Sequence, residues 1–185
     1  MKVEATKLKD CFIIHDTVFN DDRGYFFESF NKQRFAALTG ISPDFVQDNQ
    51  SKSTRGVLRG IHFQQGEHVQ AKLVRVIEGS VLDVAVDLRK TSPTFGHYVA
   101  VELSAENHVQ LFVPRGFGHA FVVLSPEATF FYKCDNLYNK ASEGGIIYND
   151  DTIGIDWQID ASEVFLSEKD AALPTFNNTK DSINF

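Results

Sequence analysis

Short apolar runs separated by turn signals follow one another along most of this chain, and this rhythm is the strongest constraint on the fold. Two such runs at 73–88 flank Glu78-Gly79, where we predict a tight hairpin. Side chains alternate in the second run, so that an apolar face opposes a face bearing Asp83 and Asp87. Further strands are predicted at 98–103, 110–113, 120–124 and 129–133. The sequence therefore predicts an all-β fold, an antiparallel sandwich or barrel without βαβ units.

Helix signals are confined to two short segments. In the first, 30–40, Asn31 can cap the start of a helix and Gly40 can end it in a left-handed conformation. The second is Ser167-Glu-Lys-Asp170, which has the pattern of a capping box and precedes Pro174. Residues 44–49 are polar and fit either a strand end or a turn. We expect a few short helices at the periphery of the β-structure.

The length and composition are those of one globular domain. A chain of 185 residues can bury a sizeable core, and no linker, repeat or shift in composition divides it, so we expect a single domain over 1–185. The N-terminus has no apolar leader and no stretch approaches membrane-spanning length. Two cysteines make no disulfide framework. We therefore expect a cytoplasmic protein that does not span a membrane.

The charge pattern favours a small anionic ligand over a nucleic acid. The formal net charge of −7 is unfavourable for general nucleic-acid binding. A few local cations can still form a positive pocket. Three basic side chains, those of Arg59, His62 and Lys72, occur within one stretch of expected strands and turns.

His62 and Lys72 each allow a structural and a chemical interpretation. A lone strand histidine is commonly a core residue, but the nearby cations favour an anionic ligand, and imidazole suits a general base at neutral pH. Lys72 shares a strand face with Val74 and Val76, so it points inward if that face lines a barrel. It then either forms a structural ion pair with Asp83 or stabilises an oxyanion formed in a reaction.

Three further residues are ambiguous in the same way. Tyr132 is either an ordinary strand tyrosine or a proton donor. Asp170 suits a helix cap, but its carboxylate can also orient a histidine. His119 can pack, donate a hydrogen bond to a substrate or phosphate, or bind a metal ion. The metal interpretation is the weakest, because no closely spaced histidine pair occurs in the chain.

Two short motifs resemble the halves of the cupin signature. Gly56 to His62 has the Gly-x5-His start of the first half, and Pro114-Arg-Gly-Phe-Gly-His119 resembles the second half. Metal-binding cupins continue the first half as His-x-His, whereas Gln64 stands at that position here. The resemblance implies a cupin-type jelly roll, a double-stranded β-barrel, with no metal ion and with a histidine free for proton transfer.

Over nearly its whole length the chain resembles the dTDP-4-dehydrorhamnose 3,5-epimerases, cupin-superfamily enzymes that use no cofactor. The matching segments are 22–28, 47–49, Ser53, 56–64, 70–76, 83–89, 92–96, 114–119, 132–133, Tyr138, 143–146 and 166–170. The resemblance implies an isomerase that inverts carbons 3 and 5 of dTDP-4-dehydro-6-deoxy-D-glucose to give dTDP-4-dehydro-L-rhamnose. That reaction belongs to dTDP-L-rhamnose biosynthesis for cell-surface polysaccharide. Tyr148 and Asp151 depart from the family pattern, which has Trp and Pro there; both changes look like loop variation.

The family pattern implies a role for each site residue. His62 removes the proton, Asp170 orients His62, Tyr132 delivers the replacement proton, and Lys72 stabilises the charge on the carbonyl oxygen. Tyr138 stacks on the thymine ring. The substrate-binding residues that the pattern implies are Arg23, Glu28, Gln47, Asp48, Asn49, Arg59, Lys72, His119, Tyr138, Glu143 and Lys169.

The resemblance also implies a homodimer, in which N-terminal strands reach the neighbouring subunit and Arg23 and Glu28 serve the partner's site. Three alternatives stay open at this point. The first is a mono-epimerase that acts on carbon 3 or carbon 5 of a related dTDP-4-keto-deoxysugar. The second is a non-catalytic cupin that binds a sugar nucleotide, and the third is a metal-dependent cupin oxygenase or isomerase.

Overall fold

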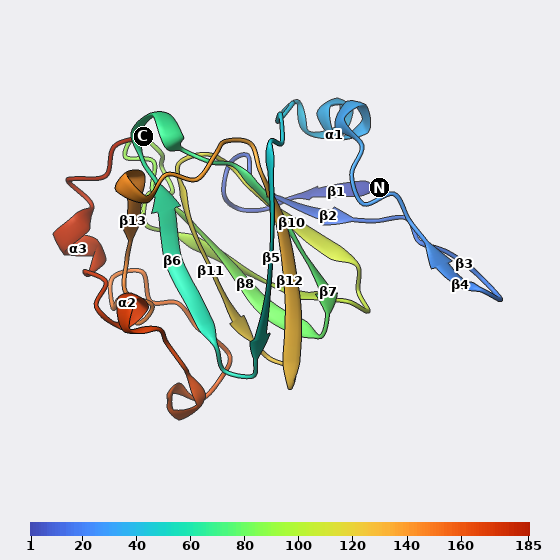
Figure 1. Cartoon of the computed structure of the whole chain (residues 1–185). Coiled ribbons are helices and arrows are strands. Elements are labelled where there is room, and N and C mark those ends of the chain that lie inside the picture. The colour runs from blue at the N-terminus through green and yellow to red at the C-terminus, as the bar shows by residue number, and fades with distance from the viewer.

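Two antiparallel sheets face each other in the computed structural model, which describes residues 1–185 (Figure 1). The larger sheet has the spatial order β1 (Lys2–Ala5), β2 (Phe12–His15), β10 (Val109–Val113), β7 (Lys72–Glu78), β12 (Glu127–Cys134) and β5 (Gln47–Thr54). The smaller sheet has the order β13 (Glu143–Gly145), β6 (Leu58–Gln64), β11 (Phe117–Val123), β8 (Ser80–Asp87) and β9 (Tyr98–Ser104). Neighbouring strands in both sheets are antiparallel, which confirms the predicted all-β fold without βαβ units.

The hairpin predicted at 73–88 is wrong. Its two runs do form β7 and β8, but β7 lies between β10 and β12 in the six-stranded sheet. β8 lies between β11 and β9 in the five-stranded sheet. Local alternation identifies a strand but not its neighbours, and here both neighbours of β7 come from distant parts of the chain, while β8 pairs with β11 and with the next strand along the chain, β9. The chain therefore crosses from one sheet to the other at Gly79.

Gly79 permits this crossing. Its φ of +76° lies in the left-handed region, and a Cβ atom at this position would lie 2.0 Å from the carbonyl oxygen of Glu127. Both constraints exclude a side chain, because other residues resist this backbone region and the carbonyl belongs to the β12 backbone. Glu78-Gly79 does form a turn, but this turn connects the two sheets and not two strands of one hairpin.

Apolar side chains bury the space between the sheets and also their outer faces. Val74 and Ala85 belong to the core between the sheets, which places the inward face of β7 as predicted. The outer face of the five-stranded sheet packs under the C-terminal segment, including Trp157. The outer face of the six-stranded sheet packs against Phe35. Because β8 is covered on both sides, even its polar residue Asp83 is fully buried.

The helices are short and peripheral, as predicted. α1 (Lys32–Thr39) follows Asn31, whose side chain caps it, and it ends at Gly40 with φ +74°. α2 (Glu168–Ala171) follows Ser167, whose Oγ accepts the Asp170 backbone N–H at 3.1 Å. The other helical segments are α3 (Phe176–Thr179), η1 (Gly66–His68), η2 (Lys140–Ser142) and η3 (Ala161–Glu163). None of the helices has the length and hydropathy needed to cross a membrane. The ambiguous segment 44–49 is irregular up to residue 46 and then enters β5.

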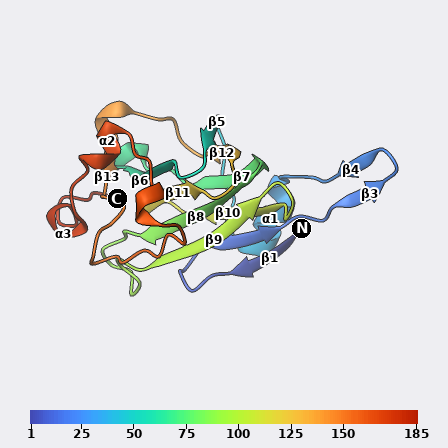
Figure 2. The ribbon, with the colours of Figure 1, turned by 90° about the horizontal axis from the view of Figure 1, so that it is seen from below.

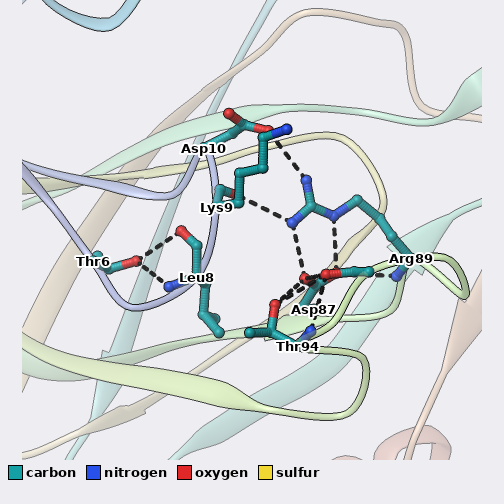
Figure 3. A network of polar contacts seen from close by, with 8 residues as sticks. Thr6, Leu8, Lys9, Asp10, Asp87, Arg89 and Thr94 are labelled. Carbon is teal, nitrogen blue, oxygen red and sulfur yellow. Dashed lines mark hydrogen bonds and ion pairs between the residues drawn. The ribbon is translucent and has the colours of Figure 1, made fainter.

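A polar network joins the loop before β2 to the end of β8 (Figure 3). Asp87 accepts hydrogen bonds from Arg89 Nη2 at 2.8 Å and from the Thr94 hydroxyl at 2.7 Å. Arg89 also donates to the Lys9 carbonyl oxygen at 3.0 Å and pairs with Asp10 at 3.3 Å. Burial raises the pKa of Asp87, but these hydrogen bonds outweigh burial and hold it below its usual value. The network therefore links the two sheets through an ionised, fully paired carboxylate.

A two-stranded arm, β3 (Phe19–Asp21) and β4 (Gly24–Phe26), extends away from the sheets, at the opposite end of the molecule from α2 and α3 (Figure 1 and Figure 2). The Gln110 side-chain amide donates to Asp16 Oδ2 at 2.6 Å and to the Ser29 carbonyl oxygen at 2.7 Å. These two bonds clamp both ends of the arm to β10. Apolar side chains are exposed along the arm, and Phe26 reaches 70% exposure.

We predict that Gly79→Ala destabilises the protein far more than Gly40→Ala. The two glycines have nearly the same φ, but an added Cβ at Gly40 meets nothing within 4 Å. Gly40→Ala should therefore cost only the left-handed strain of about 1 kcal/mol. Gly79→Ala should cost roughly 2–4 kcal/mol, because overpacking against the β12 backbone adds to the strain. Equilibrium urea unfolding measures both values, and equal costs would show that the sheet crossing does not depend on the missing side chain.

Candidate active site

A cavity of about 760 Å³ opens between the two sheets, where β5 and β6 form its edges. β5, β7 and β12 contribute one wall, β6 and β11 contribute the other, and α2 lies at the rim. Eight of the residues predicted for the site line this cavity, namely Asn49, Arg59, His62, Lys72, His119, Tyr132, Lys169 and Asp170. They come from six different elements, so only the folded chain brings them together.

His62 and Asp170 form a hydrogen-bonded pair. His62 Nε2 lies 2.6 Å from Asp170 Oδ1, and the carboxylate is almost completely buried. Burial raises the pKa of Asp170, but the hydrogen bond and charge of His62 outweigh burial and hold it below its usual value. An ionised carboxylate only accepts, so Nε2 donates to it, and in the neutral imidazole Nδ1 carries the lone pair. Nδ1 of His62 is left without a partner and can act as a base. Both interpretations of Asp170 hold, because its backbone N–H donates to Ser167 at the helix cap while its carboxylate orients His62.

Tyr132 approaches the cavity from the opposite sheet. It lies on β12, whereas His62 lies on β6, and both side chains line the same space. Burial raises the pKa of Tyr132 to about 12, so the phenol keeps its proton at neutral pH. The ammonium of Lys72 lies 5.8 Å from the centre of its ring. The protonated phenol of Tyr132 and the imidazole of His62 therefore line one cavity from opposite sheets.

Lys72 and Arg59 bring positive charge into the cavity without a carboxylate partner. The ion pair between Lys72 and Asp83, one of the two interpretations of the sequence, does not form, because Asp83 binds His119 instead and Lys72 has no carboxylate oxygen within 4.0 Å. Burial lowers the pKa of Lys72, against the opposing charge of Cys134, Asp83 and Glu143. Two uncompensated cations make this cavity attractive to an anion.

His119 is held by Asp83 inside the barrel. Its Nε2 lies 2.8 Å from Asp83 Oδ1, and both side chains are buried. Burial lowers the pKa of His119, and Asp83 offsets this only in part, while Lys72 and His62 add to the lowering. A neutral imidazole results, which can exchange a hydrogen bond with a ligand through its other nitrogen. No three His, Cys, Asp or Glu side chains are grouped in a way that could hold a metal ion.

Three more of the predicted residues adjoin the cavity through hydrogen bonds. Glu143 pairs with Lys169 at 2.6 Å and accepts the Tyr138 hydroxyl at 3.0 Å. Gln47 Nε2 donates to Asn49 Oδ1 at 3.1 Å, and Gln47 Oε1 accepts the Tyr138 backbone N–H at 3.0 Å. Tyr138 itself is half exposed. These residues form a polar rim beside an open aromatic ring.

The remaining three predicted residues lie outside the cavity. Asp48 points to the outer side of β5 and pairs with Lys133 at 2.8 Å. Arg23 lies at the turn of the arm with a side chain that is 90% exposed, and it pairs with Asp21. Glu28 pairs with Arg34 near the start of α1. Within one chain, therefore, the arm residues do not reach the site.

Comparison with known proteins identifies the family. The family model described as dTDP-4-dehydrorhamnose 3,5-epimerase matches residues 5–178. The enzyme of that name from Salmonella typhimurium is 55% identical over 94% of both chains. This chain belongs to the dTDP-4-dehydrorhamnose 3,5-epimerase family. It is an isomerase, as the sequence resemblance implied.

Solved structures of this epimerase family share the fold. The enzyme from Elizabethkingia anophelis superposes with a TM-score of 0.94 at 57% identity, over 97% of this chain and 98% of that one. The enzyme from Legionella pneumophila, solved in complex with dTDP-4-keto-L-rhamnose, gives 0.91 at 47% identity, over 95% and 93%. The predicted cupin-type jelly roll is thereby confirmed. A 3'-monoepimerase from Streptomyces bikiniensis also matches, with a TM-score of 0.89 at 33% identity over 96% of this chain and 89% of that one.

Sequence reasoning missed two features of this epimerase site. The first is Ser53, which enters the sequence analysis only as a matching position and accepts hydrogen bonds from Arg59 through its Oγ. Asp83 pairs with His119 and not with Lys72, the partner that one of the two interpretations of Lys72 gave it. The period-two pattern of β5 could have exposed Ser53, because it shares a face with Gln47 and Asn49. The partner of Asp83 depends on the register of β8 against β11, which sequence alone does not supply.

We predict that Lys72→Met makes the epimerase more stable, by about 1–3 kcal/mol near pH 7, because it removes a partly buried ammonium without a counter-charge. Since burial lowers the Lys72 pKa of the folded protein, the unfolded chain holds the extra proton between that lowered pKa and 10.5. The stability gained should therefore shrink as the pH rises toward 10.5. Urea unfolding at pH 7 and pH 9.5 measures both effects.

Lys133→Met is the matched control, because Lys133 is paired with Asp48. It should leave stability unchanged or slightly lower at either pH. A Lys72→Met variant that is less stable than the original protein would mean that the ammonium is compensated, contrary to the geometry.

Proposed function

We propose that this protein converts dTDP-4-dehydro-6-deoxy-D-glucose to dTDP-4-dehydro-L-rhamnose by inverting carbons 3 and 5, without a metal ion or cofactor. One observation carries the proposal. A histidine base held by Asp170 and a protonated Tyr132 stand on opposite sheets of one cavity that also contains unpaired Lys72 and Arg59. The reaction would belong to dTDP-L-rhamnose biosynthesis.

The chemistry requires a base on one face of the sugar and an acid on the other. Hydrogens at carbons 3 and 5 both flank the ketone at carbon 4, so loss of either proton leaves an enolate. His62 Nδ1 takes the proton, and Asp170 stabilises the imidazolium that forms. The electron pair moves to the carbonyl oxygen, where Lys72 stabilises the negative charge. Tyr132 then protonates the carbon from the opposite face, and both side chains recover their original protonation states by exchange with solvent.

The cationic and polar groups around this centre support a sugar nucleotide as the ligand. Arg59 can donate two parallel hydrogen bonds to diphosphate oxygens. His119 would bond the sugar, and Tyr138 would stack on thymine beside Gln47, Asn49, Glu143 and Lys169. The relative from Legionella pneumophila was solved with dTDP-4-keto-L-rhamnose, which has the chemistry that this cavity suits.

Inversion of both carbons is favoured over inversion of one. The 3'-monoepimerase has the same fold, so the fold cannot decide the question. Identity rises from 33% with that protein to 57% with the 3,5-epimerase from Elizabethkingia anophelis. We therefore assign both carbons to this chain.

We further propose a homodimer in which the arm completes the partner's site. The arm exposes Phe19 and Phe26, at 62% and 70%, and its Arg23 does not reach the cavity of its own chain. Exposed aromatic side chains on a projecting hairpin are costly in water and favour burial against another subunit. Glu28 and Asp48 would join the site by the same assembly. We also propose a single domain in the cytoplasm, which cell fractionation would test.

Turnover in deuterated water tests the reaction. The product should carry deuterium at carbons 3 and 5, read by NMR; label at one carbon alone would identify a mono-epimerase. His62→Asn and Tyr132→Phe should each lower kcat by about 10²–10⁴-fold with little change in the unfolding midpoint. Tyr148→Phe is the control, because Tyr148 packs against Trp157 on the outer face of the five-stranded sheet and does not line the cavity. Full activity of His62→Asn would show that His62 is not the base, and absence of turnover by the unsubstituted protein would leave only a binding function.

Mixing two inactive variants tests the dimer. Arg23→Ala and His62→Asn should each be nearly inactive, but together they should recover about a quarter of the activity, because half of randomly paired dimers are mixed and each carries one intact site. The mixture must first be unfolded and refolded together to exchange subunits. Absence of any recovery, with dimers present by sedimentation, would place Arg23 in the site of its own chain.

A further inference from the structure

Arg59 is bonded differently from the other arginines of the chain. Five of the seven arginines pair with carboxylates, namely Arg23, Arg34, Arg55, Arg89 and Arg115. Arg75 lies 4.9 Å from the centre of the Phe27 ring. Arg59 alone is held by a neutral hydroxyl, that of Ser53.

The contact with Ser53 holds the Arg59 guanidinium in place and leaves its charge and most of its N–H donors available. Ser53 Oγ accepts from Arg59 Nε at 3.3 Å and from Nη2 at 3.1 Å. A guanidinium has five N–H donors, so three remain, and they have no partner in the chain. A carboxylate in the place of Ser53 would use the same two donors but would also cancel the positive charge.

Ser53 is well placed to act as a rigid support. It is 8% exposed and lies on β5, while Arg59 lies on β6, so the bond crosses from the edge of one sheet to the other along the cavity wall. Its side chain is short and buried, whereas the Arg59 side chain is long and exposed to the cavity. Without the bond, the guanidinium would sample many rotamers, and ordering it would cost affinity on each binding event.

We infer that Ser53 is a positioning residue for the substrate diphosphate: it holds Arg59 in one orientation while leaving its charge and three donors free. This inference rests on the proposed function, since it assigns the anion that Arg59 meets. A purely structural role, in which the bond only fastens β5 to β6, is the competing explanation.

Substitutions of Ser53 separate the two explanations. Ser53→Ala should raise KM about tenfold, the range for a lost hydrogen bond to a charged group, with kcat within about threefold. Ser53→Thr keeps the hydroxyl and should restore the original KM. Ser53→Asp should raise KM about 100-fold or more, although an ion pair with Arg59 would fasten the sheets at least as well. A purely structural fastening instead predicts that Ser53→Ala lowers the unfolding midpoint and leaves KM unchanged, whereas positioning predicts a rise in KM that Ser53→Thr reverses.

Binding measurements place the effect on the diphosphate. Calorimetry should show that Ser53→Asp weakens dTDP binding strongly and leaves thymidine binding unchanged. Ser51→Asp is the matched control, because Ser51 faces the same side of β5, lines the cavity and has no side-chain hydrogen bond. It adds the same charge without pairing with Arg59, so it should weaken dTDP binding less than tenfold. Equal losses at the two positions would overturn the inference.

The outcomes also distinguish this inference from the proposed function. Failure of the unsubstituted protein to bind dTDP or turn over the keto-sugar would defeat the proposed function. Normal turnover combined with original KM values in Ser53→Ala and Ser53→Asp would defeat only the role of Ser53. If Ser53→Asp does not fold, Ser53→Ala and Ser53→Thr still decide, because a KM rise in the first that the second reverses is the expected pattern.

Discussion

The 2.6 Å hydrogen bond between His62 and Asp170 is the contact on which the site depends. It fixes which imidazole nitrogen carries the proton, and therefore which one is free to act as a base. It also joins two parts of the chain that lie 108 residues apart. Asp170 can reach His62 only because the C-terminal segment packs over the outer face of the five-stranded sheet and sets α2 at the cavity rim. The base is thus a product of tertiary packing.

In the interior of the cavity, carboxylates accompany the two histidines and not Lys72 or Arg59, whereas Lys169 at the rim pairs with Glu143. Asp170 holds His62 and Asp83 holds His119, whereas Lys72 and Arg59 have no anionic partner. Buried charge without a counter-charge lowers the stability of the empty protein. The same uncompensated charge is available to an anionic ligand and to an oxyanion formed during the reaction. Stability has been exchanged for binding and catalysis in this cavity.

The projecting arm also combines an unfavourable feature, its exposed aromatic side chains, with a proposed function, contact with another subunit. Its aromatic side chains are exposed, yet its two ends are firmly clamped by Gln110. Clamped ends combined with exposed aromatic side chains on the strands suit a segment that contacts another subunit. This view accounts for Arg23, which the family pattern assigns to the substrate and the single chain leaves in solvent.

The sequence by itself determined the local structure and the chemistry available. Apolar runs and turn signals identified β7 to β12, Asn31 and Gly40 marked α1, Ser167 marked α2, and the motifs around His62 and His119 indicated the family. These features depend on neighbours in the chain, so they can be read from it. The tertiary structure decided which strands became neighbours and which charges met. It placed β7 and β8 in different sheets, gave Asp83 to His119 and placed Ser53 beside Arg59, because each contact depends on a register between strands distant in sequence.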